Sequence, residues 1–184
     1  MKSKLIAGGL ILFYTSAIYA QSESSTGKDV KEARYENKKN DRSSTRETAT
    51  ATYQSRQAFQ QDFKDAENVN WRVSPYFDEA TFSNKGIITT AYYDFDNELV
   101  GTTTETNYDE LPSKAKAYIA KHYGDYLPEQ VILFDDNESN ETDMELFDKA
   151  FNDEDNYFIS LKKDNETIVL KSNRIGEVSF FKKL

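Results

Sequence analysis

Apolar and polar positions alternate along the chain beyond residue 53, and the period of the alternation predicts which elements form. Ala58, Phe59 and Phe63 recur at helical spacing, which predicts a short amphipathic helix over about residues 54–66. The runs 69–75, 77–82, 87–95 and 98–105 instead have β-type patterns and are rich in Thr, Tyr, Val and Ile. Turn residues separate these runs, so the pattern predicts a strand meander after the helix.

The same order of patterns then occurs a second time. Leu111-Pro112 precedes an apolar stripe that includes Ala115 and Ile119, which predicts a second helix ending near Gly124. The β-type runs that follow cover residues 127–134, 157–162, 166–171 and 177–181. A shift of 79 residues, from 82 to 161, brings apolar and turn positions of the two units into register: Phe82 onto Leu161, Ala80 onto Ile159, Ala91 onto Leu170, Asn97 onto Gly176 and Leu99 onto Val178.

This register, with a smaller shift of about 60 for the helices, predicts two tandem α–β(4)-type repeats, at about 53–107 and 108–184. Coincidence between two β-rich halves is the alternative. The predicted fold class is α+β, with an antiparallel sheet and helices packed on one face. The whole folded domain is expected to span residues 53–184.

Residues 1–52 have a different pattern. Lys2 and Lys4 precede the apolar stretch 5–18, and the small Ala20 follows it, which predicts a signal peptide over residues 1–20. The alternative, a membrane anchor, needs about 20 apolar residues, which is more than this stretch supplies. Residues 21–52 are polar and predict a disordered linker. We therefore expect an exported protein, periplasmic or secreted, with no membrane span after signal cleavage.

The composition of the chain limits both the organisms from which the protein could come and the classes of partner that it could bind. The chain has no cysteine, which for an exported protein favours a bacterial origin and excludes thiol catalysis and thiolate metal sites. Residues 53–184 hold fourteen basic and twenty-six acidic side chains, a net charge of −12. A domain with this excess of negative charge is unsuited to phosphate backbones, so nucleic acid is excluded as a partner.

Most of that negative charge lies in one insertion, residues 135–155, which holds ten carboxylates and a single lysine. Asp135, Asn137 and Ser139 have the alternate spacing of a calcium loop, but Asn140 stands at the position that requires glycine. These three residues are therefore weak calcium candidates. The favoured interpretation is a solvated acidic loop with a short helix around residues 144–151.

Catalytic signatures are missing from the sequence. His122 is the only histidine, and its place near the end of the second predicted helix suits the helix dipole. A single histidine without cysteine excludes most zinc sites and histidine-dependent nucleophilic triads. Paired carboxylates remain open as a glycosidase-type pair, but twenty-six acidic residues make chance pairs inevitable. The protein is therefore predicted not to be an enzyme and to need no cofactor.

Strand alternation also predicts which side chains lie on the helix-covered face of the sheet and which lie on the opposite face. Ten apolar residues are expected under the helices: Ala80, Phe82, Ala91, Leu99, Ile159, Leu161, Ile168, Leu170, Val178 and Phe180. The opposite, open face is the predicted partner-binding surface, with Thr90, Tyr92, Thr102, Thr104, Val169 and Phe181 as its candidate residues. The alternative is that these are ordinary strand formers on a solvated sheet. Trp71 is assigned by strand parity to the core.

Several stretches together resemble a known family. They are Phe59-x-x-x-Phe63, Ala66-Glu67-Asn68-Val69-Asn70-Trp71, Ala80-Thr81-Phe82, Ala91-Tyr92-Tyr93-Asp94, Asn97-Glu98-Leu99-Val100, Leu111-Pro112 and the end of the chain from Gly176. In this order they resemble the PepSY-like, beta-lactamase-inhibitor-like exported proteins of Bacteroidetes. The resemblance covers residues 53–184. It implies two α–β(4)-type halves, a periplasmic or secreted location and no catalytic residues, whereas inhibition is only a fold-level analogy.

The sequence departs from the family pattern in two places. Asn97 stands where glycine is commoner, and the acidic insertion is longer than the family implies. Two functional hypotheses follow from the whole sequence. The first is an exported, non-catalytic binding module for an unknown protein, as an inhibitor or accessory domain. The alternative is an acidic, calcium-responsive envelope protein.

Overall fold

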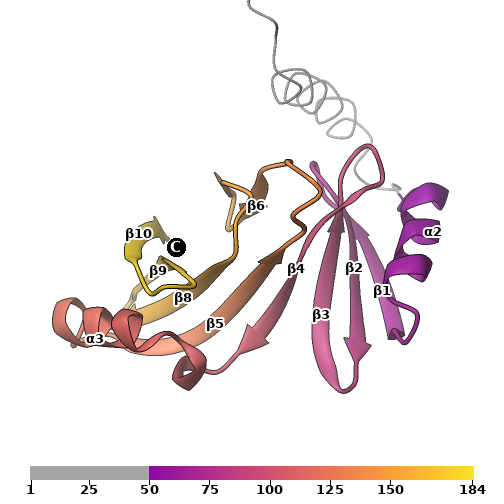
Figure 1. Ribbon diagram of the computed structural model, residues 1–184. Helices are drawn as coiled ribbons and strands as arrows, with labels where there is room; N and C mark the ends of the chain where they lie inside the picture. The colour runs from indigo at the N-terminus through magenta and orange to yellow at the C-terminus, as the bar shows by residue number, and fades with distance from the viewer. Residues whose placement is uncertain (1–49) are drawn as a thin grey trace, which may run out of the picture.

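The computed structural model of the protein describes residues 50–184, and Figure 1 shows its arrangement. The predicted signal peptide, residues 1–20, and nearly all of the predicted linker lie outside the described residues. Ala51 and Thr52, which the sequence placed at the end of that linker, belong to the folded domain. Ala51 is buried, and the Thr52 side chain accepts a hydrogen bond from the Ser55 backbone N–H as the N-cap of the first described helix.

The first half of the domain is one helix followed by four strands. The helix, α2, ends at Asp62, four residues before the predicted end, because the chain leaves helical geometry at Phe63. The bounds of the elements are α2 Tyr53–Asp62, β1 Glu67–Val73, β2 Asp78–Asn84, β3 Ile87–Tyr93 and β4 Leu99–Thr106.

The second half has the same order of elements with an extra hairpin between its first two strands. Its elements are the short 3-10 helix η1 Tyr108–Glu110, α3 Ser113–His122, β5 Leu127–Asp136, the hairpin strands β6 Met144–Leu146 and β7 Lys149–Phe151, then β8 Asn156–Lys163, β9 Glu166–Asn173 and β10 Val178–Lys183. Both halves therefore run helix then four strands. That the two arose as copies of one unit stays a prediction.

All eight main strands form one antiparallel sheet in the order β1-β2-β3-β4-β5-β8-β9-β10. The two halves join where β4 pairs with β5, so the sheet is continuous across the domain. With the two helices at its ends (Figure 1), this confirms the predicted α+β class. No described helix has the length and apolar character that a membrane crossing requires.

Both helices pack on one face of the sheet, which we call the helix side. Under α2 lies a cluster of Phe59, Ala80, Phe82, Ala91 and Tyr93, with Trp71 packed against it, as its parity predicted. Under α3 lies a mainly aliphatic cluster that includes Ile119, Ile159 and Leu170. The ten predicted core residues are on this side, but Phe180 remains 56% exposed because β10 is the last strand of the sheet.

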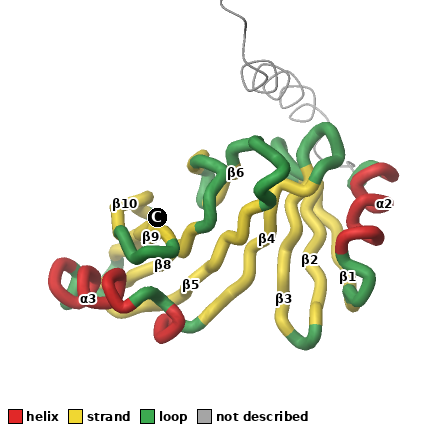
Figure 2. Tube along the Cα trace, viewed as in Figure 1, coloured by secondary structure: helices red, strands yellow, loops and turns green. Residues whose placement is uncertain are grey.

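The acidic insertion packs against the other face of the sheet, which we call the hairpin side. Figure 2 shows its loops and the β6–β7 hairpin beside β4, β5 and β8. The helix predicted around residues 144–151 is wrong. Met144, Phe147 and Phe151 have helix-like spacing, but Phe147 and Asp148 adopt positive φ (54° and 51°) and form a two-residue hairpin turn.

Candidate functional site

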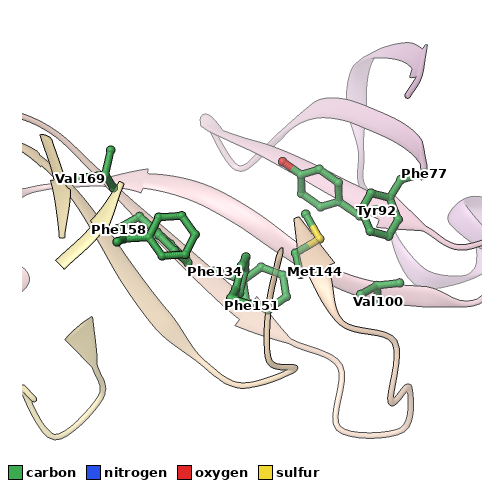
Figure 3. Packing of buried hydrophobic residues seen from close by; sticks show 9 residues of the cluster. Phe77, Tyr92, Val100, Phe134, Met144, Phe151, Phe158 and Val169 are labelled. Carbon is green, nitrogen blue, oxygen red and sulfur yellow. The ribbon is translucent and has the colours of Figure 1, made fainter. Parts of the chain in front are cut away.

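The middle of the hairpin side is a dense cluster of aromatic and aliphatic side chains (Figure 3), which we call the central cluster. Its buried members are Phe77, Tyr92, Val100, Phe134, Met144, Phe151, Phe158, Val169 and Phe181. The Phe151 ring meets the rings of Phe134 and Phe158, at centroid distances of 5.2 and 4.7 Å. Met144 and Phe151 come from the hairpin, and the others come from the sheet or its edges. The insertion therefore contributes two buried residues to the core.

This packing overturns half of the predicted open face. Tyr92, Val169 and Phe181 point to the predicted side, but they are only 8%, 0% and 4% exposed. All three belong to the central cluster, in which the hairpin residues Phe151 and Lys149 lie against Phe181 and the Phe77 ring lies against Tyr92. None of the three is accessible to a partner in this conformation.

Thr102 and Thr104 are not on the hairpin side at all. Thr102 pairs with Ala91 of the cluster under α2, and Thr104 pairs with Leu133, which packs on the cluster under α3. The cause is a β-bulge beside Gly101, where the register between β3 and β4 shifts. Beyond the bulge, each β4 side chain lies on the face opposite to the one that simple alternation predicts.

Part of the hairpin side remains accessible on β2 and β3, next to the insertion. We call this the threonine surface, and it consists of Thr81, Ser83, Ile88 and Thr90. The hydroxyls of Thr81 and Thr90 hydrogen-bond across the strands at 2.9 Å, and Ile88 is 61% exposed. Of the six predicted partner-binding residues, only Thr90 lies on this surface.

The threonine surface ends at a buried hydrogen bond on the same face. The Tyr92 hydroxyl lies 2.9 Å from Thr103 Oγ1. Burial raises the pKa of Tyr92 to about 12, so its hydroxyl is neutral at physiological pH. The hydrogen bond between Tyr92 and Thr103 therefore marks the boundary between the threonine surface and the buried central cluster.

Several polar contacts fasten the insertion to the sheet. The Asn140 side-chain amide and the Thr142 hydroxyl donate to Asp94 Oδ2 at 3.1 and 3.3 Å. The other oxygen of Asp94 accepts the backbone N–H groups of Asp96 and Glu98 at the β3–β4 turn. Asp94 therefore joins one turn of the sheet to the start of the insertion, although nothing in its sequence position marked it for this role.

Two lysines fasten the hairpin itself. Lys149 Nζ donates to the Phe181 carbonyl oxygen at 2.7 Å and lies over the Phe181 ring, 4.8 Å from its centre. Lys182 donates to the Phe147 carbonyl oxygen at the hairpin turn. The hairpin thus donates one hydrogen bond to the outer strand β10, and β10 donates one to the hairpin.

The three weak calcium candidates are not brought together. Asp135 forms an ion pair with Arg174 at 3.0 Å, while Asn137 Oδ1 accepts the Ser139 hydroxyl at 2.8 Å and the Asn137 amide donates to the Leu99 carbonyl oxygen. Within residues 50–184, no group of three or more His, Cys, Asp or Glu side chains is arranged to hold a metal ion. Asp135 is thus engaged apart from the contact between Asn137 and Ser139, and calcium binding by these three residues stays a prediction.

His122 lies in the last turn of α3, as its sequence position predicted. It is exposed, and its ring packs against Tyr118 at a centroid distance of 4.4 Å. At this position the ring N–H of His122 is near the last carbonyl groups of α3, where a hydrogen-bond donor is favourable.

Comparison with known proteins places the fold. No protein-family model matches the sequence, and no curated protein matches it in sequence. Solved structures do match in shape. A BLIP-like protein from Bacteroides fragilis has a TM-score of 0.58 at 14% identity, over 75% of this chain and 89% of its own. A DUF2874 family protein from Bacteroides uniformis has a TM-score of 0.58 at 16% identity, over 70% and 86% of the two chains.

A third structure, a provisionally assigned periplasmic protein from Bacteroides eggerthii, has a TM-score of 0.59 at 18% identity, over 74% of this chain and 89% of its own. At these identities the likeness is one of fold. It agrees with the BLIP-like fold that the resemblance drawn from the sequence implied. The PepSY-like part stays a prediction.

Proposed function

We propose that the protein is an exported, non-catalytic binding module that docks a partner protein on the threonine surface. The export follows from the N-terminal sequence pattern and is supported by the periplasmic designation of one similar fold. The single observation that carries the proposal is the division of the hairpin side into a sealed central cluster and an accessible part beside it. A rigid sheet surface loses little conformational entropy when a partner binds.

The chemistry of the threonine surface fits protein recognition. The hydrogen bond between Thr81 and Thr90 fixes both side chains before binding. Ile88 supplies an exposed apolar anchor, and Arg72 borders the surface with a salt bridge to Glu79 at 2.6 Å. An apolar centre with a polar and charged border is the usual composition of a protein interface.

Adjacent isoleucines give a matched test. Ile87 and Ile88 are 55% and 61% exposed, and strand alternation puts Ile87 on the helix side and Ile88 on the threonine surface. The full chains of wild type, Ile88→Asp and Ile87→Asp are used as bait in envelope and culture-supernatant extracts of the source bacterium. We expect one saturable partner that wild type and Ile87→Asp retain and that Ile88→Asp loses at least about tenfold in affinity.

Both variants keep the strand pairing and the buried core, so circular dichroism and the thermal midpoint should match those of wild type. Equal capture by Ile88→Asp and Ile87→Asp would remove the threonine surface from the proposal. Failure of wild type to retain any saturable partner would contradict the binding function itself.

A further inference from the structure

The two ends of the acidic insertion meet at its base. Strand β5 ends with Asp136, and strand β8 begins with Asn156. Asn156 pairs directly with Phe134, two residues before Asp136, so the side chains of Asp136 and Asn156 lie at diagonal positions on the hairpin side. The Asp136 backbone N–H also donates to Asp155 Oδ1 at 2.8 Å. The chain therefore leaves the sheet and returns to it at one place.

This base holds two buried oxygens that lack a donor. Asn156 is fully buried, and its amide group donates to the Glu154 carbonyl oxygen at 2.8 Å, while its Oδ1 accepts nothing. Asp136 Oδ1 is buried and also accepts nothing. Among the described residues only Asn84, at the far β2–β3 turn, has a third such side-chain atom. Two buried acceptors without a donor, at diagonal positions on paired strands, are costly, and a proton on Asp136 that is donated to Asn156 would remove both deficits.

The electrostatic surroundings favour that proton. Burial, followed by the charges of Asp153, Glu138 and Asp155, raises the pKa of Asp136 to about 6, and the backbone amide of Asn137 opposes the rise only in part. The cations at the base are engaged elsewhere. Arg174 pairs with Asp135 and Asp155, and Lys171 pairs with Glu154.

We propose that Asp136 is a proton-operated clasp: its protonated carboxyl donates to the Asn156 amide oxygen and holds the insertion on the sheet, and loss of the proton loosens the insertion. The proton moves between water and Asp136, so no other reactant is needed. The released segment would be residues 137–154, which include the hairpin that covers the central cluster. The clasp operates within one chain, with or without a partner on the threonine surface.

The direction of the pH effect follows from the raised pKa. Between the ordinary carboxyl pKa and about 6, the closed insertion binds more protons than the open one. The stabilisation is complete in acid below the ordinary pKa and is lost as the pH rises through about 6. Mild acid closes the clasp, and neutral or alkaline solution weakens it.

Adjacent aspartates give a matched pair of variants. Asp136→Asn keeps the shape of the side chain and supplies a permanent donor to Asn156, without a titratable charge. Asp135→Asn changes the neighbouring carboxyl, which pairs with Arg174 on the helix side. Amide hydrogen exchange of residues 137–154 is measured on the full chains near pH 5 and near pH 8 and is corrected for the intrinsic exchange rate.

In wild type and Asp135→Asn, we expect opening of residues 137–154 to be at least about tenfold more frequent near pH 8 than near pH 5. Asp136→Asn should stay protected at both values. NMR titration of the Asp136 carboxyl gives an independent readout that needs no variant, and we expect a midpoint near 6.

Three outcomes would overturn the clasp. If the carboxyl group of Asp136 titrates with an ordinary midpoint, it carries no proton in mild acid and cannot act as the clasp. Equal pH dependence in Asp136→Asn and Asp135→Asn would assign the effect to other groups. The third outcome is that millimolar calcium restores the protection of residues 137–154 near pH 8 in wild type but not in Asp136→Asn. The base of the insertion would then be a cation site.

Discussion

The two halves of the sheet use the same turn but pack their helices in different ways. Asp94 N–H donates to the Glu98 carbonyl oxygen and Asn97 N–H to the Asp94 carbonyl oxygen, at 3.0 and 3.1 Å. In the second half, Asn173 and Gly176 repeat this pattern, at 3.2 and 3.0 Å. Asn97 and Gly176 both have positive φ, 66° and 83°, as the alignment of the two turns requires.

The packing volume is placed at different positions under the two helices. Under α2 the strand residues Ala80 and Ala91 are small, while Phe82 from the same sheet and Phe59 from the helix are large. Under α3 the corresponding residues are Ile159, Leu170, Leu161 and Ile119, which are of similar size. A helix can therefore pack on the sheet through a mixture of small and aromatic residues or through aliphatic residues of even size.

The helices are also positioned by different forces. In the first half, the single proton of the buried Ser55 hydroxyl is shared between Asp78 Oδ2 at 2.8 Å and Asn97 Oδ1 at 3.1 Å. In the second half, Ala115 occupies the equivalent place and lies directly against Gly176. One half uses a buried polar network where the other uses close backbone contact, so a common fold does not require common interactions.

The largest expected effect is at Phe59. Its ring meets Phe63, Trp71 and Phe82 at 5.3, 5.4 and 5.0 Å, and the alanines on the strands cannot fill the space that it leaves. We expect Phe59→Ala to lower the free energy of unfolding by about 3–5 kcal/mol, measured by urea denaturation. Tyr53→Ala, on the exposed side of the same helix, is the control. A smaller loss for Phe59→Ala than for Ile119→Ala would contradict the central place of Phe59 among these three rings.

The next effect is at Gly176. A Cβ atom there would lie 2.9 Å from Ala115 N and 2.9 Å from Lys114 Cβ, and its φ of 83° disfavours a side chain. We expect Gly176→Ala to lower the free energy of unfolding by about 2–4 kcal/mol. Gly86→Ala has the same φ but meets nothing within 4 Å, so it should cost only about 1–2 kcal/mol. Equal losses in the two variants would show that close packing of α3 on the turn has no energetic weight.

The smallest of the three effects is at Ser55. Ser55→Ala removes the one hydroxyl proton that Asp78 and Asn97 share, while the Thr52 backbone N–H still donates to Asp78 and the Thr52 hydroxyl to Asn97. We expect a loss of about 1–2 kcal/mol in the same denaturation experiment. Ser113→Ala, at the exposed start of α3, should change stability by less than about 0.5 kcal/mol. A neutral Ser55→Ala would mean that the polar network does not help to hold α2.

Local patterns in the sequence predicted the elements of the sheet well. The β-type run 87–95 contains β3, and the run 98–105 matches β4 to within a residue at each end. The helix-side positions followed from strand alternation in β2, β8 and β9, where the pairing between neighbouring strands is regular. Alternation is reliable there because the register shifts with their other neighbours add the extra residue to β1, β5 and β10 and not to β2, β8 and β9 themselves.

The candidate surface was predicted poorly because its accessibility depends on long-range contacts. Gly101 within a strand is a recognised sign of a bulge, and it could have warned that Thr102 and Thr104 change sides. No comparable local sign shows that Met144 and Phe151 would join the same buried cluster as Tyr92. The acidic composition of the insertion concealed its few apolar residues, and only their packing against the sheet identifies them as core.

The order of the strands has a consequence for how the chain folds. Every neighbouring pair in the main sheet is also consecutive in the chain once the β6–β7 hairpin is set aside. Such a meander has low contact order, so we expect it to form early and fast. The β5–β8 pair must first close a loop over residues 137–155, although each doubling of loop length costs only about 0.6 kcal/mol. The insertion should therefore dock last, on a sheet that already exists, and its length can change without altering the pairing beneath it.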